Sequence, residues 1–183
     1  MANVSRSLLS LLILFVGIFM LTTTSASGQL TEIENKLPKS VPLEVEFKNY
    51  DKENWWRDLE LKVTNTGKKP IYYLWLILQM NVTNPVSGRQ GAISFKFGDL
   101  RKFYPASSDG IADANDPAIL PNKSYTFYVS AASVKAWDML SERGDFIEPR
   151  KAELDHGGTR FGDGTGLESG GSPIKKNPPR GTF

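Results

Sequence analysis

Hydrophobic and polar residues alternate with a period of two in four short stretches of the chain. Side chains along a β-strand point to opposite faces in turn, so this alternation predicts strands with one buried face. Shorter signals at 152–155 and around Phe161 predict one or two more strands. The apolar positions of the four stretches are Val41, Leu43, Val45 and Phe47; Leu59, Leu61 and Val63; Ile93, Phe95 and Phe97; and Tyr125, Phe127 and Val129.

The stretch 71–82 differs from the others because both of its faces are apolar. Its aromatic and β-branched residues, and the turn at Gly67 and Pro70 before it, favour a central strand over a helix. We expect the face with the longer apolar run to lie in the core; it comprises Tyr72, Leu74, Leu76, Leu78 and Met80. The opposite face carries Tyr73, Trp75 and Ile77, which is too much apolar surface to leave bare.

The period changes between residues 131 and 143, where Val134, Trp137 and Leu140 recur every three residues. This spacing predicts one short amphipathic helix, which Ser130 or Ser133 can cap at its start and Gly144 can end. The helix offers the only unassigned apolar stripe of suitable size. We therefore expect it to cover the outer face of the 71–82 strand.

The two ends of the chain differ in composition from the middle. A basic start with Arg6, an apolar run over 8–21 and small residues over 22–28 predict a secretory signal peptide, cleaved after Ala26 or Gly28. An uncleaved anchor is the alternative, and it is the only membrane contact that we expect. The mature chain is predicted to consist of a polar leader, a β-domain and a disordered tail rich in Gly, Pro and Lys. These segments are residues 29–40, 41–163 and 164–183.

About seven short strands with one helix before the last of them predict an all-β fold, an antiparallel immunoglobulin-like β-sandwich. The chain has no cysteine, which favours a bacterial periplasmic or secreted protein whose core supplies its stability without disulfides. Its 22 Lys and Arg against 20 Asp and Glu are interspersed, so we expect no nucleic-acid partner.

Two short motifs resemble known domains. The segment 59–71, which contains Val63-Thr64-Asn65-Thr66-Gly67, resembles the second-to-third strand hairpin of bacterial immunoglobulin-like adhesion modules. The segment 161–165, Phe-Gly-Asp-Gly-Thr, resembles a turn of polycystic-kidney-disease-type domains. Together the motifs are most similar to uncharacterised exported bacterial proteins of immunoglobulin-like fold. That resemblance implies a fold but no activity.

Two groups of residues are candidates for binding. Trp55 and Trp56 are adjacent just before a strand, where an extended backbone turns one of them away from the core, and that ring could stack on a sugar. The loop containing Asp109, Asp113 and Asp116 supplies hard oxygen ligands that suit calcium, although Asp is also an ordinary turn residue. Calcium is the only cofactor that the sequence suggests.

His156 is the only histidine, and the chain has no Gly-x-Ser-x-Gly elbow. The sequence therefore predicts a protein that is not an enzyme: an exported binding or structural module with an unknown protein or carbohydrate partner. A carbohydrate-binding module that uses Trp55 or Trp56 is the first alternative. A small secreted hydrolase that uses His156 is the second.

Overall fold

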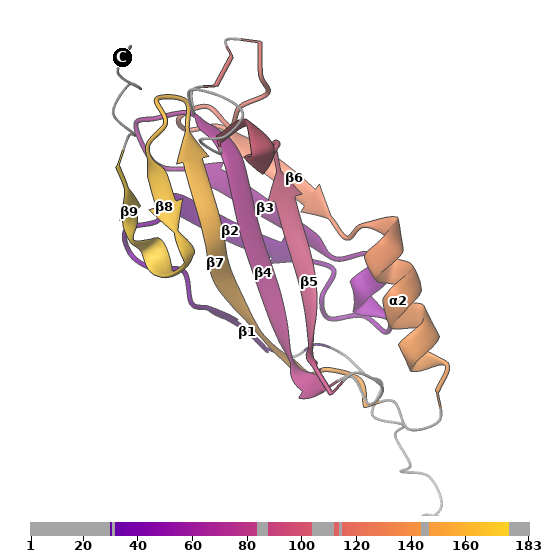
Figure 1. Ribbon diagram of the computed structural model, residues 1–183. Helices are drawn as coiled ribbons and strands as arrows, with labels where there is room; N and C mark the ends of the chain where they lie inside the picture. Colours follow the sequence, from indigo (N-terminus) through magenta and orange to yellow (C-terminus); the bar gives the residue numbers. More distant parts are fainter. Residues whose placement is uncertain are drawn as a thin grey trace, which may run out of the picture.

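The computed structural model describes residues 30, 32–83, 88–103, 112–113, 115–143 and 147–175. The predicted signal peptide lies outside these residues. The described part is mostly β: two sheets face each other in a sandwich-like arrangement, and one short helix precedes the last strands (Figure 1). Within the described segments, no helix is both long enough and apolar enough to cross a bilayer.

The smaller sheet has three antiparallel strands in the order β2-β3-β6. They are β2 (Leu43–Lys48), β3 (Glu60–Asn65) and β6 (Ser124–Tyr128). Their alternation follows the sequence pattern, with Leu61, Val63 and Phe127 buried against the larger sheet. The prediction of half-buried strands in these stretches is confirmed.

The larger sheet has the order β5-β4-β7-β8-β9, and these neighbours are antiparallel. A sixth strand, β1, lies beside β7 and runs parallel to it. The strands are β1 (Glu32–Asn35), β4 (Ile71–Thr83), β5 (Gln90–Phe97), β7 (Lys151–Phe161), β8 (Gly166–Glu168) and β9 (Pro173–Ile174). The described residues also include three short 3-10 turns: η1 (Trp55–Arg57), η2 (Leu100–Phe103) and η3 (Ser169–Gly171).

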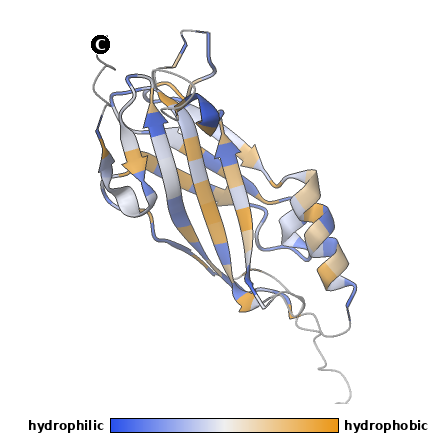
Figure 2. Cartoon of the chain, viewed as in Figure 1, coloured by the Kyte–Doolittle hydropathy of each residue, from blue (hydrophilic) through white to orange (hydrophobic). Residues whose placement is uncertain are grey.

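The core lies between the two sheets, and β4 contributes many of its buried side chains. Figure 2 shows this strand as largely hydrophobic along its central part. The predicted core face is confirmed over most of its length, because four of its side chains are fully buried: Leu74, Leu76, Leu78 and Met80. Tyr72 departs from this pattern, and its neighbour Tyr73 is buried in its place.

Two β-bulges in the pairing of β4 with β7 determine where the side chains in the N-terminal half of β4 point. Ile71 pairs with Phe161 and Tyr73 with Arg160, so Tyr72 is an extra residue in β4. Trp75 pairs with Gly158 and Leu76 with His156, so Gly157 is an extra residue in β7. A bulge re-aims the side chain of the inserted residue. The prediction that Tyr72 lies in the core is therefore wrong.

Helix α2 (Ala131–Ser141) confirms the predicted helix, and the Ser130 side chain caps it by accepting a hydrogen bond from Ser133 N at 3.1 Å. Its predicted position is wrong. Trp137 packs against Trp55 and Trp56, with ring centroids 6.5 and 6.0 Å away, and closes one end of the sandwich. Figure 1 places α2 beside η1 at that end.

Residues of its own sheet cover part of the outer face of β4, at Trp75. The Trp75 ring lies against the backbone of Gly157, where a Cβ atom would sit only 2.5 Å from it. Lys96 Nζ lies 5.1 Å from the centroid of the same ring, and Trp75 Nε1 donates a hydrogen bond to Ser94 Oγ at 3.4 Å. A long cationic side chain on a neighbouring strand thus supplies part of the cover that was expected from the helix.

Both predicted flanking segments contribute to the fold. The leader contains β1, and Leu30 just before it has an exposed fraction of 0%. Residues 166–174, predicted to be disordered, form β8, η3 and β9 and bury Leu167. The predicted polar leader thus contains a strand, and the prediction of disorder from residue 164 is wrong for residues 166–174. Residues 176–183 lie outside the described residues.

Candidate functional site

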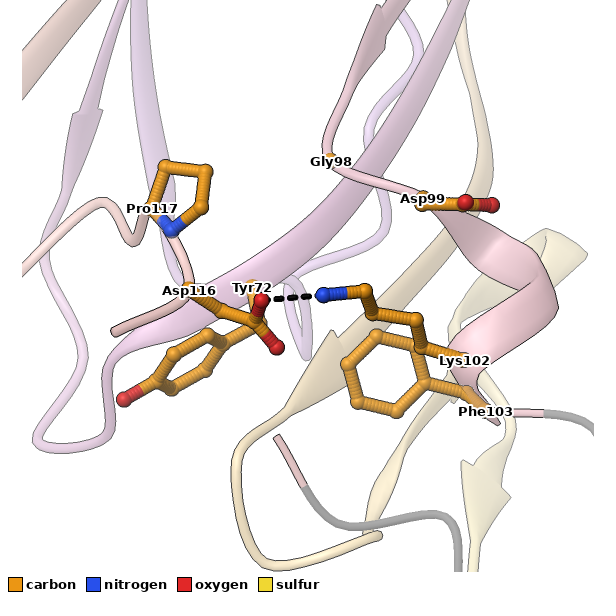
Figure 3. A pocket seen from close by; sticks show the side chains of 7 residues that line it. All are labelled: Tyr72, Gly98, Asp99, Lys102, Phe103, Asp116 and Pro117. Atoms are coloured by element: carbon orange, nitrogen blue, oxygen red, sulfur yellow. Dashed lines mark hydrogen bonds and ion pairs between the residues drawn. The ribbon is translucent and has the colours of Figure 1, made fainter. Parts of the chain in front are cut away.

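A cavity of about 240 Å³ lies at the end of the sandwich where β4 begins and β5 ends. This is the opposite end of β5 from Gly91, which meets Trp137 of helix α2. Figure 3 shows the lining residues, which come from β4, from the turn after β5 and the following η2, and from the segment before β6. They are Tyr72, Gly98, Asp99, Lys102, Phe103, Asp116 and Pro117.

The backbone at this end of the sheet determines which side chains reach the cavity. The bulge in β4 turns the Tyr72 ring out of the core and toward it. Gly98 directly follows β5 and has a φ of +74°, and a Cβ atom there would lie 1.9 Å from Tyr72 O, so only glycine fits. The sharp turn at Gly98 leads directly into η2, which carries Lys102 and Phe103 to the other side of the cavity.

Two ion pairs set the charge of the cavity. Lys102 Nζ pairs with Asp116 Oδ1, and Asp116 Oδ2 accepts a hydrogen bond from Asp113 N at 3.0 Å. The hydrogen bond from Lys102 lowers the pKa of Asp116, and the same contact raises the pKa of Lys102. Arg101 Nη2 lies 2.8 Å from Asp99 Oδ2 and, by this hydrogen bond, lowers the pKa of Asp99 to about 2.

These shifts decide what the cavity can do chemically. Both lining carboxyl groups are held ionised, and the lining lysine is held protonated, so none of the three has a pKa moved toward neutrality. A general acid or base works best with a pKa near the operating pH. None of these three groups is therefore suited to act as a general acid or base at neutral pH.

The structure describes two of the three predicted calcium ligands, Asp113 and Asp116. Asp109 lies outside the described residues. Asp113 Oδ1 accepts a hydrogen bond from Asn115 N at 2.9 Å, and Asp116 is paired with Lys102, so both carboxylates hold the turn together. Across the residues that the structure describes, no group of three or more His, Cys, Asp or Glu side chains is placed to hold a metal ion.

The two adjacent tryptophans both lie in the interior, with exposed fractions of 0% for Trp55 and 1% for Trp56. The expectation that one of them faces outward assumed an extended backbone. The segment is instead a 3-10 turn, and its rings meet edge to face at a centroid distance of 5.9 Å. Neither ring offers a free face in this arrangement, so the expectation that one ring points outward is wrong. Sugar binding by Trp55 or Trp56 stays a prediction.

His156 is buried on β7, and its Nε2 lies 2.8 Å from Thr159 Oγ1. Burial lowers its pKa because the interior disfavours the imidazolium form, and the backbone of Glu168 opposes this shift. A nucleophile-and-base pair must reach a substrate from a cleft. His156 and Thr159 are both enclosed by the sheet, which favours a structural role for this hydrogen bond.

Sequence reasoning singled out one residue that lines the cavity, Asp116, as a candidate calcium ligand, and missed the others. Tyr72 was assigned to the core because a regular strand puts it there, and the bulge depends on pairing with β7. Lys102 and Phe103 lie in a long polar stretch, 98–123, that carries no period. The glycine at position 98, directly after a predicted strand, was the one local signal for a sharp turn.

No family model matches the chain, and comparison with curated proteins and with solved structures likewise finds no match.

Proposed function

We propose that the protein is an exported, non-enzymatic binding module of immunoglobulin-like fold that acts in the bacterial envelope or outside the cell. Its ligand site is the cavity at the end of the sandwich. The observation that carries the proposal is that the cavity pairs each of its lining carboxylates with a cation, which suits recognition and not acid–base chemistry.

The strand order supports the immunoglobulin-like part of the proposal. The order β2-β3-β6 facing β5-β4-β7-β8 corresponds to strands A-B-E facing C′-C-F-G. Helix α2 then lies in the E-to-F connection. Domains of this architecture carry their functional residues on the loops at the ends of the sandwich, and the cavity lies at one such end.

Export is supported by the order of basic, apolar and small residues over 1–28. The structure of the following segment is compatible with cleavage there, because Leu30 is already part of the core. A mature chain that begins at Ser27 or Gln29 would keep every described residue.

The experiment separates binding from turnover. Purified mature protein is mixed with envelope material and with insoluble polysaccharides, and two quantities are measured: the fraction of protein that sediments and the soluble product that is released. Sedimentation without product supports a binding module. Product release that depends on the protein would establish an enzyme, and the absence of sedimentation with every material would remove the binding role.

Export is tested in the same preparation by the mass of the protein recovered outside the cytoplasm. A mass that starts at Ser27 or Gln29 is expected. A protein with residues 1–28 intact on the membrane would establish an anchored module instead.

A further inference from the structure

We propose that the cavity at the end of the sandwich binds a single neutral sugar ring, such as the terminal unit of a glycan. This inference rests on the proposed binding function and specifies its ligand. It is carried by three properties of the cavity: two aromatic rings, an adjacent donor and acceptor, and lining carboxylates that are each paired with a cation.

The aromatic rings supply the apolar part of the site. Tyr72 comes from the bulge in β4 and Phe103 from η2, and Figure 3 shows both rings with Pro117 at the same cavity. A pyranose ring presents C–H groups on its faces, and aromatic surface is well suited to cover them while water is excluded. The bulge matters here because a regular strand would direct Tyr72 elsewhere.

The ion pair supplies the polar part. Lys102 Nζ is a donor and the Asp116 carboxylate an acceptor, and they lie side by side at the cavity. A sugar hydroxyl donates one hydrogen bond and accepts others, so two neighbouring hydroxyls can contact both members of the pair. Asp116 is held in place from a second direction by Asp113 N, which preorganises the acceptor.

Charge balance selects a neutral ligand. Lys102 is matched by Asp116, and Arg101 by Asp99, so an anionic ligand would meet two carboxylates that are already ionised. A small cation would have to compete with the lysine that is already paired. A ligand that carries hydroxyl groups but no charge avoids both costs.

The size of the cavity limits the ligand to about one ring. Its volume of about 240 Å³ is below the range of about 300–1,000 Å³ that is usual for drug-sized ligands. A ligand with so few atoms binds weakly, so we expect a Kd on the order of 1 mM for a monosaccharide.

The test is a titration of ¹⁵N-labelled mature protein with methyl glycosides of neutral hexoses, pentoses and N-acetylhexosamines, followed by amide NMR. We expect at least one sugar to shift the amides of Gly98, Lys102 and Asp116. Phe103→Leu keeps an apolar side chain but removes the ring, and it should weaken that sugar about tenfold or more. Asp116→Asn should weaken it as well, because it breaks the donor–acceptor pair.

The matched control is Tyr128→Ala, which removes an exposed aromatic ring from the end of β6 that leads into α2. It should leave sugar affinity unchanged. Melting temperatures of all variants show whether they are folded. If Asp116→Asn does not fold, Phe103→Leu alone decides the test, because it retains apolar packing.

Four results would overturn the proposal. The first is that no neutral sugar, at concentrations of tens of millimolar, shifts any amide resonance, and the second is that the shifted amides lie away from the cavity. The third is an unchanged sugar affinity in Phe103→Leu. The fourth is tighter binding of glucuronate, inorganic phosphate or tetramethylammonium than of any neutral sugar. Sedimentation separates this proposal from the proposed binding function. If Phe103→Leu sediments with envelope material as the unaltered protein does, the protein is still a binding module, and only the assignment of the sugar site to this cavity is wrong.

Discussion

Lys69 Nζ donates a hydrogen bond to Asp163 Oδ2 at 2.6 Å and so joins the turn after β3 to the turn after β7. The same ammonium donates to Thr165 Oγ1 at 3.0 Å and lies 5.6 Å from the centroid of the Phe161 ring. The two short motifs that resemble known domains, separated by almost a hundred residues, therefore meet in space. Each turn stabilises the position of the other.

This pair predicts a pH-dependent contribution to stability. Burial raises the pKa of Asp163, but hydrogen bonds from Lys69 and Thr165 outweigh it and lower the pKa from 3.8 to about 2. A lowered folded-state pKa stabilises the protein above the unfolded-state pKa, and this stabilisation is lost as the pH falls from about 4 to about 2. Asp163→Asn should reduce the free energy of unfolding by about 1 kcal/mol at pH 7, since the pair is half exposed and screened by solvent.

Urea unfolding at a series of pH values checks this prediction. The difference between the unaltered protein and Asp163→Asn should shrink as the pH falls below 4. Asp51→Asn, an exposed carboxylate in a loop, is the control. An equal difference at all pH values would show that the Asp163 charge contributes nothing.

Asn65 is predicted to be essential for joining the two layers. Its side chain is fully buried, and Nδ2 donates to Ile119 O at 2.8 Å and to Lys69 O at 2.9 Å, while Oδ1 accepts from Gly67 N at 2.9 Å. Asn65→Ala removes the partners of Lys69 O and Gly67 N, whereas Ile119 O keeps its hydrogen bond from Ile71 N, and we expect a cost of about 3 kcal/mol. Chemical denaturation measures the loss, with the exposed Thr66→Ala as control. A loss below about 1 kcal/mol would mean that water replaces the side chain.

Trp137 is predicted to couple to Trp56 and not to Trp75. Trp137→Ala should cost about 3–5 kcal/mol because it empties a buried aromatic site, whereas the exposed Met139→Ala on the same helix should cost little. Double-mutant cycles from urea denaturation give the coupling energies. We expect about 1 kcal/mol or more between Trp137 and Trp56, and additivity between Trp137 and Trp75. A coupling energy between Trp137 and Trp75 would instead support the placement expected from the sequence, with the helix over the outer face of β4.

Gly157 is predicted to be required by the ring above it. An added Cβ would lie 2.5 Å from Trp75, so Gly157→Ala must displace the indole, at a cost of about 1–3 kcal/mol. In a protein that already carries Trp75→Ala, the obstacle is gone. Adding Gly157→Ala to that variant should therefore lower the free energy of unfolding much less than adding it to the unaltered protein. Thermal and urea unfolding of the four proteins check this. An equal cost of Gly157→Ala in both backgrounds would assign the glycine a backbone role instead.

The sequence by itself determined the elements whose signal is local. Alternating apolar residues place β2, β3, β5 and β6, because side chains alternate along any strand regardless of its partner. The three-residue spacing around Trp137 and the cap at Ser130 place the helix for the same reason, since a helix face and its first turn are set by near neighbours. The core face of β4 also follows, from Leu74 to Met80.

Only the tertiary structure decided the features that depend on a second segment. Strands β1, β8 and β9 carry too few apolar residues to be predicted from the sequence. They form because a neighbouring strand offers unpaired backbone groups: β7 for β1 and β8, and β8 for β9. The bulges at Tyr72 and Gly157 arise from the register between β4 and β7, which no single stretch contains. The cavity also depends on contacts between segments that are distant in the sequence. Its rings and charges come from three separate segments, and packing alone brings Tyr72, Phe103 and Asp116 together.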